Sequence, residues 1–144
     1  MGAGAAPRCV FVDSGVWIAF FSIRDGRHGD ADAMLRAAAA TRLAMVTTNL
    51  VLAEVHRWLL FHAGVAPAAA ALASIDATAL VRVEWATASH HRAARGWLAK
   101  LSDQRITYTD AVSFAVMVAQ RCRAAMTFDR DFVVAGFTPW WPSR

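Results

Sequence analysis

Short apolar runs alternate with longer helical patterns along this chain. The apolar runs, which are typical of strands buried in a parallel sheet, cover residues 9–12, 43–47, 80–83 and 124–127. The helical patterns between them cover residues 16–21, 33–40, 49–62, 67–76, 87–100 and 110–120. We expect a last short strand within residues 133–144. This alternation predicts an α/β fold, in which helices cover both faces of a mostly parallel sheet.

The helix predicted over residues 49–62 has signals at both ends. Thr48 can cap its first turn, and Gly64 stands where helices commonly stop. Thr109 has the same capping position ahead of the helix over residues 110–120. The body of that second helix is apolar all round, which predicts that it is buried.

A charged segment with glycines follows the first helix. Residues 23–32 contain two glycines and five charges, which indicates an exposed and mobile loop. We therefore expect the second helix to start at about residue 33, with Asp30 or Asp32 as its cap. The loop lies close in sequence to the end of the first strand.

Length and hydropathy limit the possible classes of protein. The 144 residues suit one domain with one core, and we expect residues 1–144 to form a single domain. Apolar residues make up 57% of the chain and the mean hydropathy is +0.34, so part of the apolar surface is expected to meet a partner. The longest uncharged apolar run, residues 63–75, is shorter than the roughly 20 residues of a membrane span. No signal peptide is predicted either, so we expect a cytoplasmic protein with no membrane contact.

Net charge and cysteine content narrow the possible classes of protein only slightly. The net charge of +4 and the sequence pI of about 10.0 suit a polyanionic partner, although the arginines are scattered along the chain. Cys9 and Cys122 lie in apolar surroundings without the spacing of a metal site. We expect two buried free thiols.

Four acidic residues stand at positions that the predicted fold brings to one edge of the sheet. Asp13 directly follows the first strand, and Asp129 follows the strand predicted over residues 124–127. Asp110 opens a buried helix, and Glu54 lies within an apolar helix surface. Because the carboxyl ends of parallel strands meet along one edge, these acids can converge on one pocket.

Three of these four acids also have a purely structural explanation. Asp13 is a common kind of helix cap, and Asp110 gains from the helix dipole whatever else it does. Glu54 can form a surface pair with Arg57. These alternatives stay open for single residues, whereas four acids in this order are harder to explain by structure alone.

A cluster of carboxylates has a chemical consequence. Carboxylates that lie close together raise one another's pKa unless a cation neutralises them. An all-oxygen cluster without cysteine or paired histidine selects Mg²⁺, with Mn²⁺ as the alternative, and such ions can activate a water beside a phosphodiester. Glu54, surrounded by Leu50, Trp58 and Phe61, is expected to pay a desolvation cost that only a cation offsets.

Four short motifs carry a resemblance to a known family. They are Val-Asp-Ser at 12–14, Asn-Leu-Val-Leu-Ala-Glu at 49–54, Tyr-Thr-Asp-Ala at 108–111 and Thr-Phe-Asp-Arg-Asp-Phe at 127–132. In their order and spacing, over nearly the whole chain, they resemble the PIN-domain ribonucleases. Within that family the chain is similar to the VapC-type toxins of bacterial toxin–antitoxin pairs.

The resemblance implies a three-layer α/β/α sandwich, Mg²⁺-dependent cleavage of RNA, a homodimer and a small inhibitory antitoxin protein. The family's catalytic and metal-binding acids match Asp13, Glu54, Asp110 and Asp129. The neighbours that hydrogen-bond them match Ser14 and Thr127. Asp131 stands where the family varies, so we leave it outside the ligand set.

We therefore expect a Mg²⁺-dependent endoribonuclease that cleaves RNA by a metal-activated water and acts as the toxin of a toxin–antitoxin module. Arg24 and Arg27, in the charged segment, are candidates for binding substrate. One alternative is a weakly catalytic or non-catalytic RNA- or protein-binding module on the same fold, which the presence of all four acids disfavours. The other is a different Mg²⁺-dependent phosphoryl-transfer hydrolase. The chain lacks the Gly-rich phosphate loop and the early Asp-x-Asp motif that would favour it.

Overall fold

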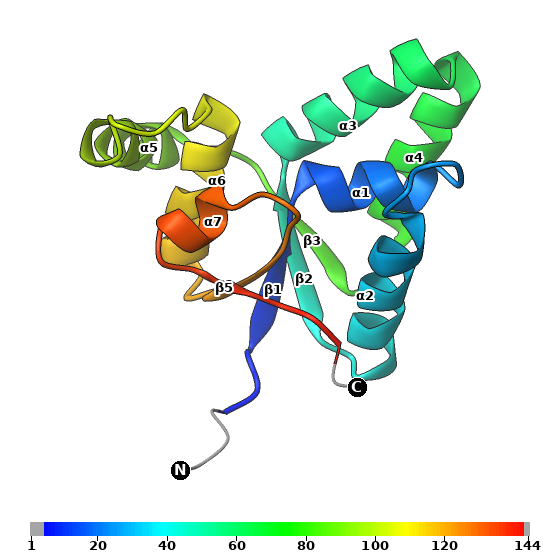
Figure 1. Ribbon diagram of the computed structural model, residues 1–144, viewed down its shortest axis with the longest axis horizontal. Coiled ribbons are helices and arrows are strands. Elements are labelled where there is room, and N and C mark those ends of the chain that lie inside the picture. Colours follow the sequence, from blue (N-terminus) through cyan, green and yellow to red (C-terminus); the bar gives the residue numbers. More distant parts are fainter. Residues whose placement is uncertain (1–4, 143–144) are drawn as a thin grey trace.

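A sheet of five strands lies between two groups of helices in the computed structural model, which describes residues 5–142 (Figure 1). The strands are β1 (Cys9–Val12), β2 (Ala44–Thr48), β3 (Val81–Glu84), β4 (Ala124–Met126) and β5 (Thr138–Pro139). The helices are α1 (Ser14–Phe21), α2 (His28–Ala40), α3 (Asn49–His62), α4 (Val65–Ala77), α5 (Ala88–Lys100), α6 (Tyr108–Ala119) and α7 (Asp131–Val134). The predicted α/β/α sandwich is confirmed.

The strand order places the end of β1 at a special point of the sheet. The order is β3-β2-β1-β4-β5, and all neighbouring strands are parallel. Helices α1 to α4 cover one face, and α5 to α7 cover the other (Figure 1). The chain therefore leaves β1 toward one side of the sheet and returns to β4 on the other side. Open parallel sheets bind ligands at such a switch point, beyond the carboxyl ends of the strands.

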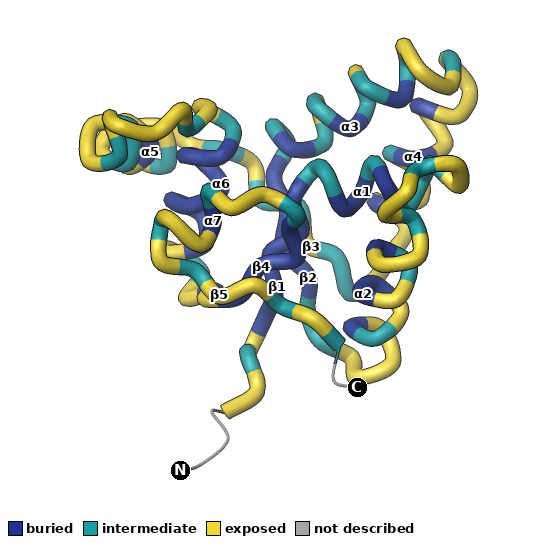
Figure 2. The backbone as a smooth tube through the Cα atoms, in the orientation of Figure 1, coloured by how far each residue is buried: buried dark blue, intermediate teal, exposed yellow. Residues whose placement is uncertain are grey.

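The core is concentrated on β1 and α6. Every residue of β1 is buried, and residues 110–117 of α6 are all buried (Figure 2). Phe114 of α6 packs against Phe132 with ring centroids 5.0 Å apart, and Phe132 lies 6.0 Å from Phe11. The predicted burial of α6 is confirmed for residues 110–117, whereas Val118 near its end is 59% exposed. Because residues 110–117 are enclosed on all sides, the first turn of α6 has a fixed position. Both cysteines are buried and unpaired, as predicted.

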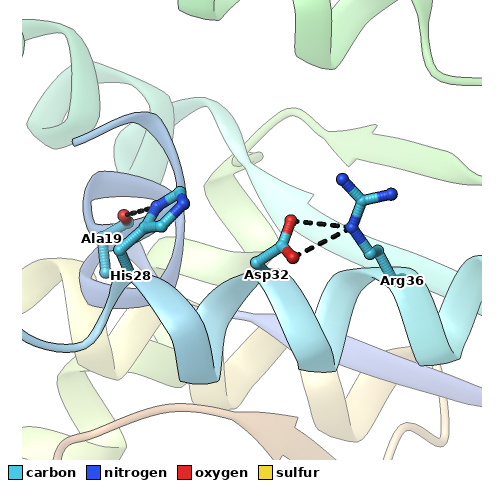
Figure 3. Close-up of polar contacts among 4 residues, drawn as sticks. All are labelled: Ala19, His28, Asp32 and Arg36. Carbon is cyan, nitrogen blue, oxygen red and sulfur yellow. Dashed lines mark hydrogen bonds and ion pairs between the residues drawn. The ribbon is translucent and has the colours of Figure 1, made fainter. Parts of the chain in front are cut away.

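Helix α2 starts earlier than the sequence predicts. It begins at His28, so the loop expected over residues 23–32 ends five residues sooner. The Nδ1–H of His28 donates a hydrogen bond of 2.9 Å to the carbonyl oxygen of Ala19 in α1 (Figure 3). This contact ties the start of α2 to α1, although Gly29 in the first turn is a poor helix former.

The predicted acidic cap of α2 is wrong. Arg27 occupies the capping position without a side-chain hydrogen bond, and both Asp30 and Asp32 lie inside the helix. Asp32 instead forms an ion pair of 2.9 Å with Arg36, one turn later (Figure 3). Pairs at this spacing stabilise an exposed helix slightly. Because α2 begins at His28, Arg27 stands at the start of a helix and not in the middle of the predicted loop.

Threonine caps define the two helices that carry acids. The Oγ1 of Thr48 accepts the backbone N–H of Val51 at 3.1 Å, which confirms the predicted start of α3. Helix α6 starts at Tyr108, so Thr107 caps it and not Thr109. The Thr107 Oγ1 accepts the backbone N–H of Asp110 at 3.1 Å.

The described part of the surface carries several large apolar side chains. Ile23, Val65, Trp85 and Phe61 are each at least 70% exposed. Of the apolar run that ends with Phe61, Leu59 is buried while Trp58 and Leu60 are partly buried against the core. Within residues 5–142, none of the helices has the length and apolar character needed to cross a membrane.

Candidate active site

Asp13 directly follows β1 and is held at both carboxylate oxygens. Its side chain is only 5% exposed. The Oδ1 accepts the backbone N–H of Ser14 at 2.8 Å, and Oδ2 accepts the hydroxyl of Thr127 at 3.1 Å. Its own backbone N–H donates to the carbonyl oxygen of Met126 in β4. Asp13 therefore caps α1, as the structural alternative proposes, and in addition is fixed against β4.

Thr127 links the acid of β1 to the acids that follow β4. While its hydroxyl donates to Asp13, its Oγ1 accepts the backbone N–H of Asp129 at 2.9 Å. The Oδ1 of Asp129 in turn accepts the backbone N–H of Asp131 at 2.9 Å. This series of hydrogen bonds fixes the carboxylates of Asp13 and Asp129 and the backbone of Asp131 relative to one another. Ser14 contributes through its backbone, whereas Thr127 contributes through its side chain.

Three carboxylates come together beside this series. Asp110 in the first turn of α6, Asp129 and Asp131 each offer one oxygen, and these oxygens all lie within 4.8 Å of one another. Asp110 is 7% exposed, and no donor among the described residues reaches its carboxylate. The structure thus brings Asp131, which the sequence left outside the ligand set, next to two of the predicted acids. We call Asp110, Asp129 and Asp131 the aspartate trio.

Burial and mutual repulsion raise the pKa of these acids. Burial, followed by the charges of Asp13 and Asp129, raises the pKa of Asp110 to about 7. Burial raises the pKa of Asp13 to about 6, against the opposing effect of its hydrogen bonds from Ser14 and Thr127. The pKa of Asp131 is also raised, by burial and by Asp129. Among the described residues, no ion pair offsets the charge of these three acids.

Glu54 lies near the cluster without being part of the trio. It is partly buried on α3, and its charge contributes to the raised pKa of both Asp13 and Asp110. The described residues show no ion pair between Glu54 and Arg57, whose guanidinium lies 5.2 Å from the ring centroid of Phe61. The alternative of a surface pair is thus absent. Glu54 is less buried than Asp13 and Asp110, which are 5% and 7% exposed.

An open cavity of about 550 Å³ lies at this edge of the sheet. We call it the acid pocket, and its lining includes Asp13, Ser14, Asp25, Arg27, Trp58, Phe128, Asp129 and Arg130. Of the two predicted substrate-binding arginines, Arg27 lines this pocket and Arg24 does not. The Arg27 guanidinium lies 4.7 Å from the ring centroid of Phe128. Arg130 also lines this pocket, but the sequence did not single it out, although it lies inside the 127–132 motif.

The residues present fit a divalent cation. The donors are all carboxylate oxygens, which Mg²⁺ and Mn²⁺ prefer. The two ion pairs found among residues 5–142 join Asp32 to Arg36 and Glu84 to Arg82, so neither neutralises the cluster. The trio would supply direct ligands, with Asp13 and Glu54 adding negative charge close by. A cation would offset the repulsion that raises the pKa of Asp110 and Asp13.

Known proteins share the sequence and the fold of this chain over most of its length. The PIN domain family matches residues 10–137. The chain is 37% identical over 129 residues to the 23S rRNA-specific endonuclease VapC20 of Mycobacterium tuberculosis, a match that covers 89% of this chain and 95% of that protein. The crystal structure of VapC20, described as a Sarcin-Ricin loop cleaving toxin, superposes with a TM-score of 0.82 over 92% of this chain and 99% of that one. The structure of VapBC2 from Rickettsia felis, bound to a DNA fragment from its promoter, has a TM-score of 0.69 over 92% of this chain and 98% of that one. At 12% identity, it shows a shared fold alone.

Proposed function

The chain belongs to the PIN-domain family, and on this basis we propose that it is an endoribonuclease that hydrolyses RNA phosphodiester bonds with a bound Mg²⁺ or Mn²⁺. The observation that carries the proposal is the aspartate trio, with Asp13 buried beside it at the switch point of the sheet. The similarity to VapC20, whose name describes an rRNA endonuclease, supports RNA as the substrate class.

The trio has the composition that such an ion requires. Asp110, Asp129 and Asp131 would hold it through one oxygen each, while Asp13 and Glu54 keep the local charge negative. When bound, a divalent cation supplies a water of lowered pKa and offsets charge on the phosphodiester.

The role of the surrounding residues is to keep these oxygens in place. Thr127 and the backbone N–H of Ser14 hold the carboxylate of Asp13, so it need not reorganise when substrate arrives. The buried helix α6 fixes Asp110 in the same way. Arg27 at the wall of the acid pocket is placed to attract a phosphate of the RNA. These groups bind and orient; hydrolysis then adds water across one phosphodiester bond.

We also propose that the chain is the toxin of a toxin–antitoxin module in the cytoplasm, acts as a homodimer and is inhibited by a small protein. The acid pocket suits inhibition by an arginine, because a planar guanidinium can pair with two carboxylates, such as Asp13 and Asp129 in its lining, and offset their negative charge. Trp58 lines this pocket, and Phe61, one turn further along α3, is 70% exposed. These apolar side chains would extend the contact with the antitoxin beyond the acids.

The proposed function can be tested by mapping RNA ends after induced expression. We expect new ends at a small number of RNA positions in cells that express the wild-type chain. Cells that express Asp13→Asn at the same level should lack them, because the variant retains the fold but loses a central charge. Identical end profiles for the two chains would contradict an endoribonuclease activity of this site.

A further inference from the structure

A second cavity adjoins the acid pocket on the side of β5. Its volume is about 340 Å³. Arg27, Phe128 and Asp129 line both cavities, and Asp30 and Trp141 belong to the second one only. We call it the side cavity. Its walls come from the beginning of α2, the segment after β4 and the chain after β5, which Figure 1 shows running toward α2. The side cavity therefore lies directly next to the acids.

An aromatic surface forms one part of the side cavity. Trp141 is 52% exposed, and its ring centroid lies 6.4 Å from that of Phe128, at an interplanar angle of 48°. The guanidinium of Arg27 lies over the Phe128 ring. The half-exposed indole beside this cation–π pair keeps part of its apolar face in water, where a flat ligand can cover it. This combination is a known platform for nucleic-acid bases, which stack on aromatic rings and on guanidinium planes.

We propose that the side cavity binds one unpaired base of the RNA substrate, stacked on Trp141, in a nucleotide that flanks the cleaved phosphate. This inference rests on the proposed function. Because Phe128 and Asp129 line both cavities, a base in the side cavity and a phosphate at the acids would belong to neighbouring nucleotides. The base must be unpaired, since a base inside a duplex cannot turn its face toward a protein ring.

The charges in the side cavity favour a base over a phosphate. The carboxylates of Asp30 and Asp129 both line it, and they repel an anion. A carboxylate accepts hydrogen bonds, however, and the N–H and amino groups on base edges are donors. The arrangement thus attracts the phosphate backbone of the RNA at Arg27 and the edge of the base at the two carboxylates. It also predicts a preference for bases with exocyclic amino groups over uracil.

The test compares two replacements of Trp141 that differ in one property. Trp141→Phe keeps a flat aromatic face, whereas Trp141→Leu keeps an apolar side chain that can pack on Phe128 but cannot stack on a base. Trp85→Ala is the matched control, because Trp85 is 70% exposed and lines a separate cavity beside α3, α4 and β3. Each protein is titrated with a short single-stranded RNA that contains 2-aminopurine, in excess chelator so that no cleavage occurs. Stacking quenches the fluorescence of this base.

We expect Trp141→Leu to weaken RNA binding about tenfold and to abolish the quenching, while Trp141→Phe keeps most of both. Trp85→Ala should match the wild type. In the cleavage assay with metal, Trp141→Leu should raise KM by a similar factor and change kcat little.

Three results would overturn the base site. In the first, Trp141→Leu cleaves RNA and quenches the 2-aminopurine fluorescence as well as the wild type does. This result would leave the proposed function intact. In the second, the Phe and Leu variants lose binding equally, which means that Trp141 serves packing. In the third, the Leu variant keeps RNA binding and loses only its antitoxin. A wild type that neither binds nor cleaves RNA would refute the proposed function as well.

Discussion

Replacing Asp110 by asparagine is expected to slow RNA cleavage by roughly a hundredfold or more while making the metal-free protein more stable. Asp110 is 7% exposed, and no donor among the described residues hydrogen-bonds its carboxylate. The variant removes a ligand of the trio, so the rate should fall. It also removes a buried charge that Asp13 and Asp129 repel, so the fold should gain free energy of unfolding when no cation is present.

These two effects of opposite sign separate a functional acid from a structural one. Replacing a residue that stabilises the fold lowers activity and stability together, whereas replacing Asp110 should lower activity and raise stability. The measurements are the single-turnover cleavage rate and the melting temperature in chelator. Asp76→Asn, at an exposed acid near the end of α4, should leave both unchanged. Full activity of purified Asp110→Asn would remove Asp110 from the site.

The second large effect is a stability that depends on both pH and metal. In the metal-free protein the pKa values of Asp13 and Asp110 rise from 3.8 to about 6 and about 7. Between the unfolded and folded values, the folded state binds more protons than the unfolded state. Stability from these groups is therefore complete below the unfolded pKa and is lost as pH rises through about 6 and about 7. The loss is on the order of a few kcal/mol.

A bound cation should reverse this loss. Because Mg²⁺ and Mn²⁺ bind ionised carboxylates, binding releases protons and stabilises the folded state most at the higher pH. In chelator, the melting temperature should fall as pH rises from about 5 to about 8, and millimolar Mg²⁺ should reduce this fall. In chelator, the melting temperature of Asp110→Asn should fall less with pH than that of the wild type. It should also rise little when the ion is added. Glu54→Gln, outside the trio, should gain less than the wild type but more than Asp110→Asn. If neither Mg²⁺ nor Mn²⁺ changes the melting temperature of the wild type, the result would contradict a metal site here.

The sequence predicts those features of the site that depend on periodicity and on strand ends. Asp13 and Asp129 follow buried strands, and the all-apolar body of α6 predicts that Asp110 opens a buried helix. These relations hold because a parallel sheet aligns the carboxyl ends of its strands, whatever the details of packing. The fold class and the family could accordingly be inferred before any coordinates.

Other features depend on single tertiary contacts that have no periodic signal. Arg27 reaches the acid pocket because the bond between His28 and Ala19 starts α2 early. Asp131 joins the trio because residues 131–134 form the single turn of α7, too short for a helical pattern. Trp141 follows a strand of only two residues, β5. Such short elements are fixed by their neighbours and not by their own propensities.

The burial of Glu54 shows the opposite error. Apolar neighbours on a helix predicted that it would be enclosed, yet Phe61 is 70% exposed and Trp58 lines an open pocket. An apolar helix surface indicates burial only where another layer covers it, and this part of α3 rises beyond the sheet (Figure 1). The same exposed surface is the one that we assign to the antitoxin.

Whether the aspartate trio cleaves RNA through a bound cation is tested most directly by chelation. A single end-labelled RNA is incubated with the purified chain in excess chelator, and the cleavage rate is measured again after Mg²⁺ or Mn²⁺ is added back. We expect cleavage to stop in chelator and to return with either ion at the same positions, but not with Asp110→Asn. Cleavage that continues at an unchanged rate in chelator, or that Asp110→Asn performs equally well, would contradict a metal-dependent ribonuclease built on these acids.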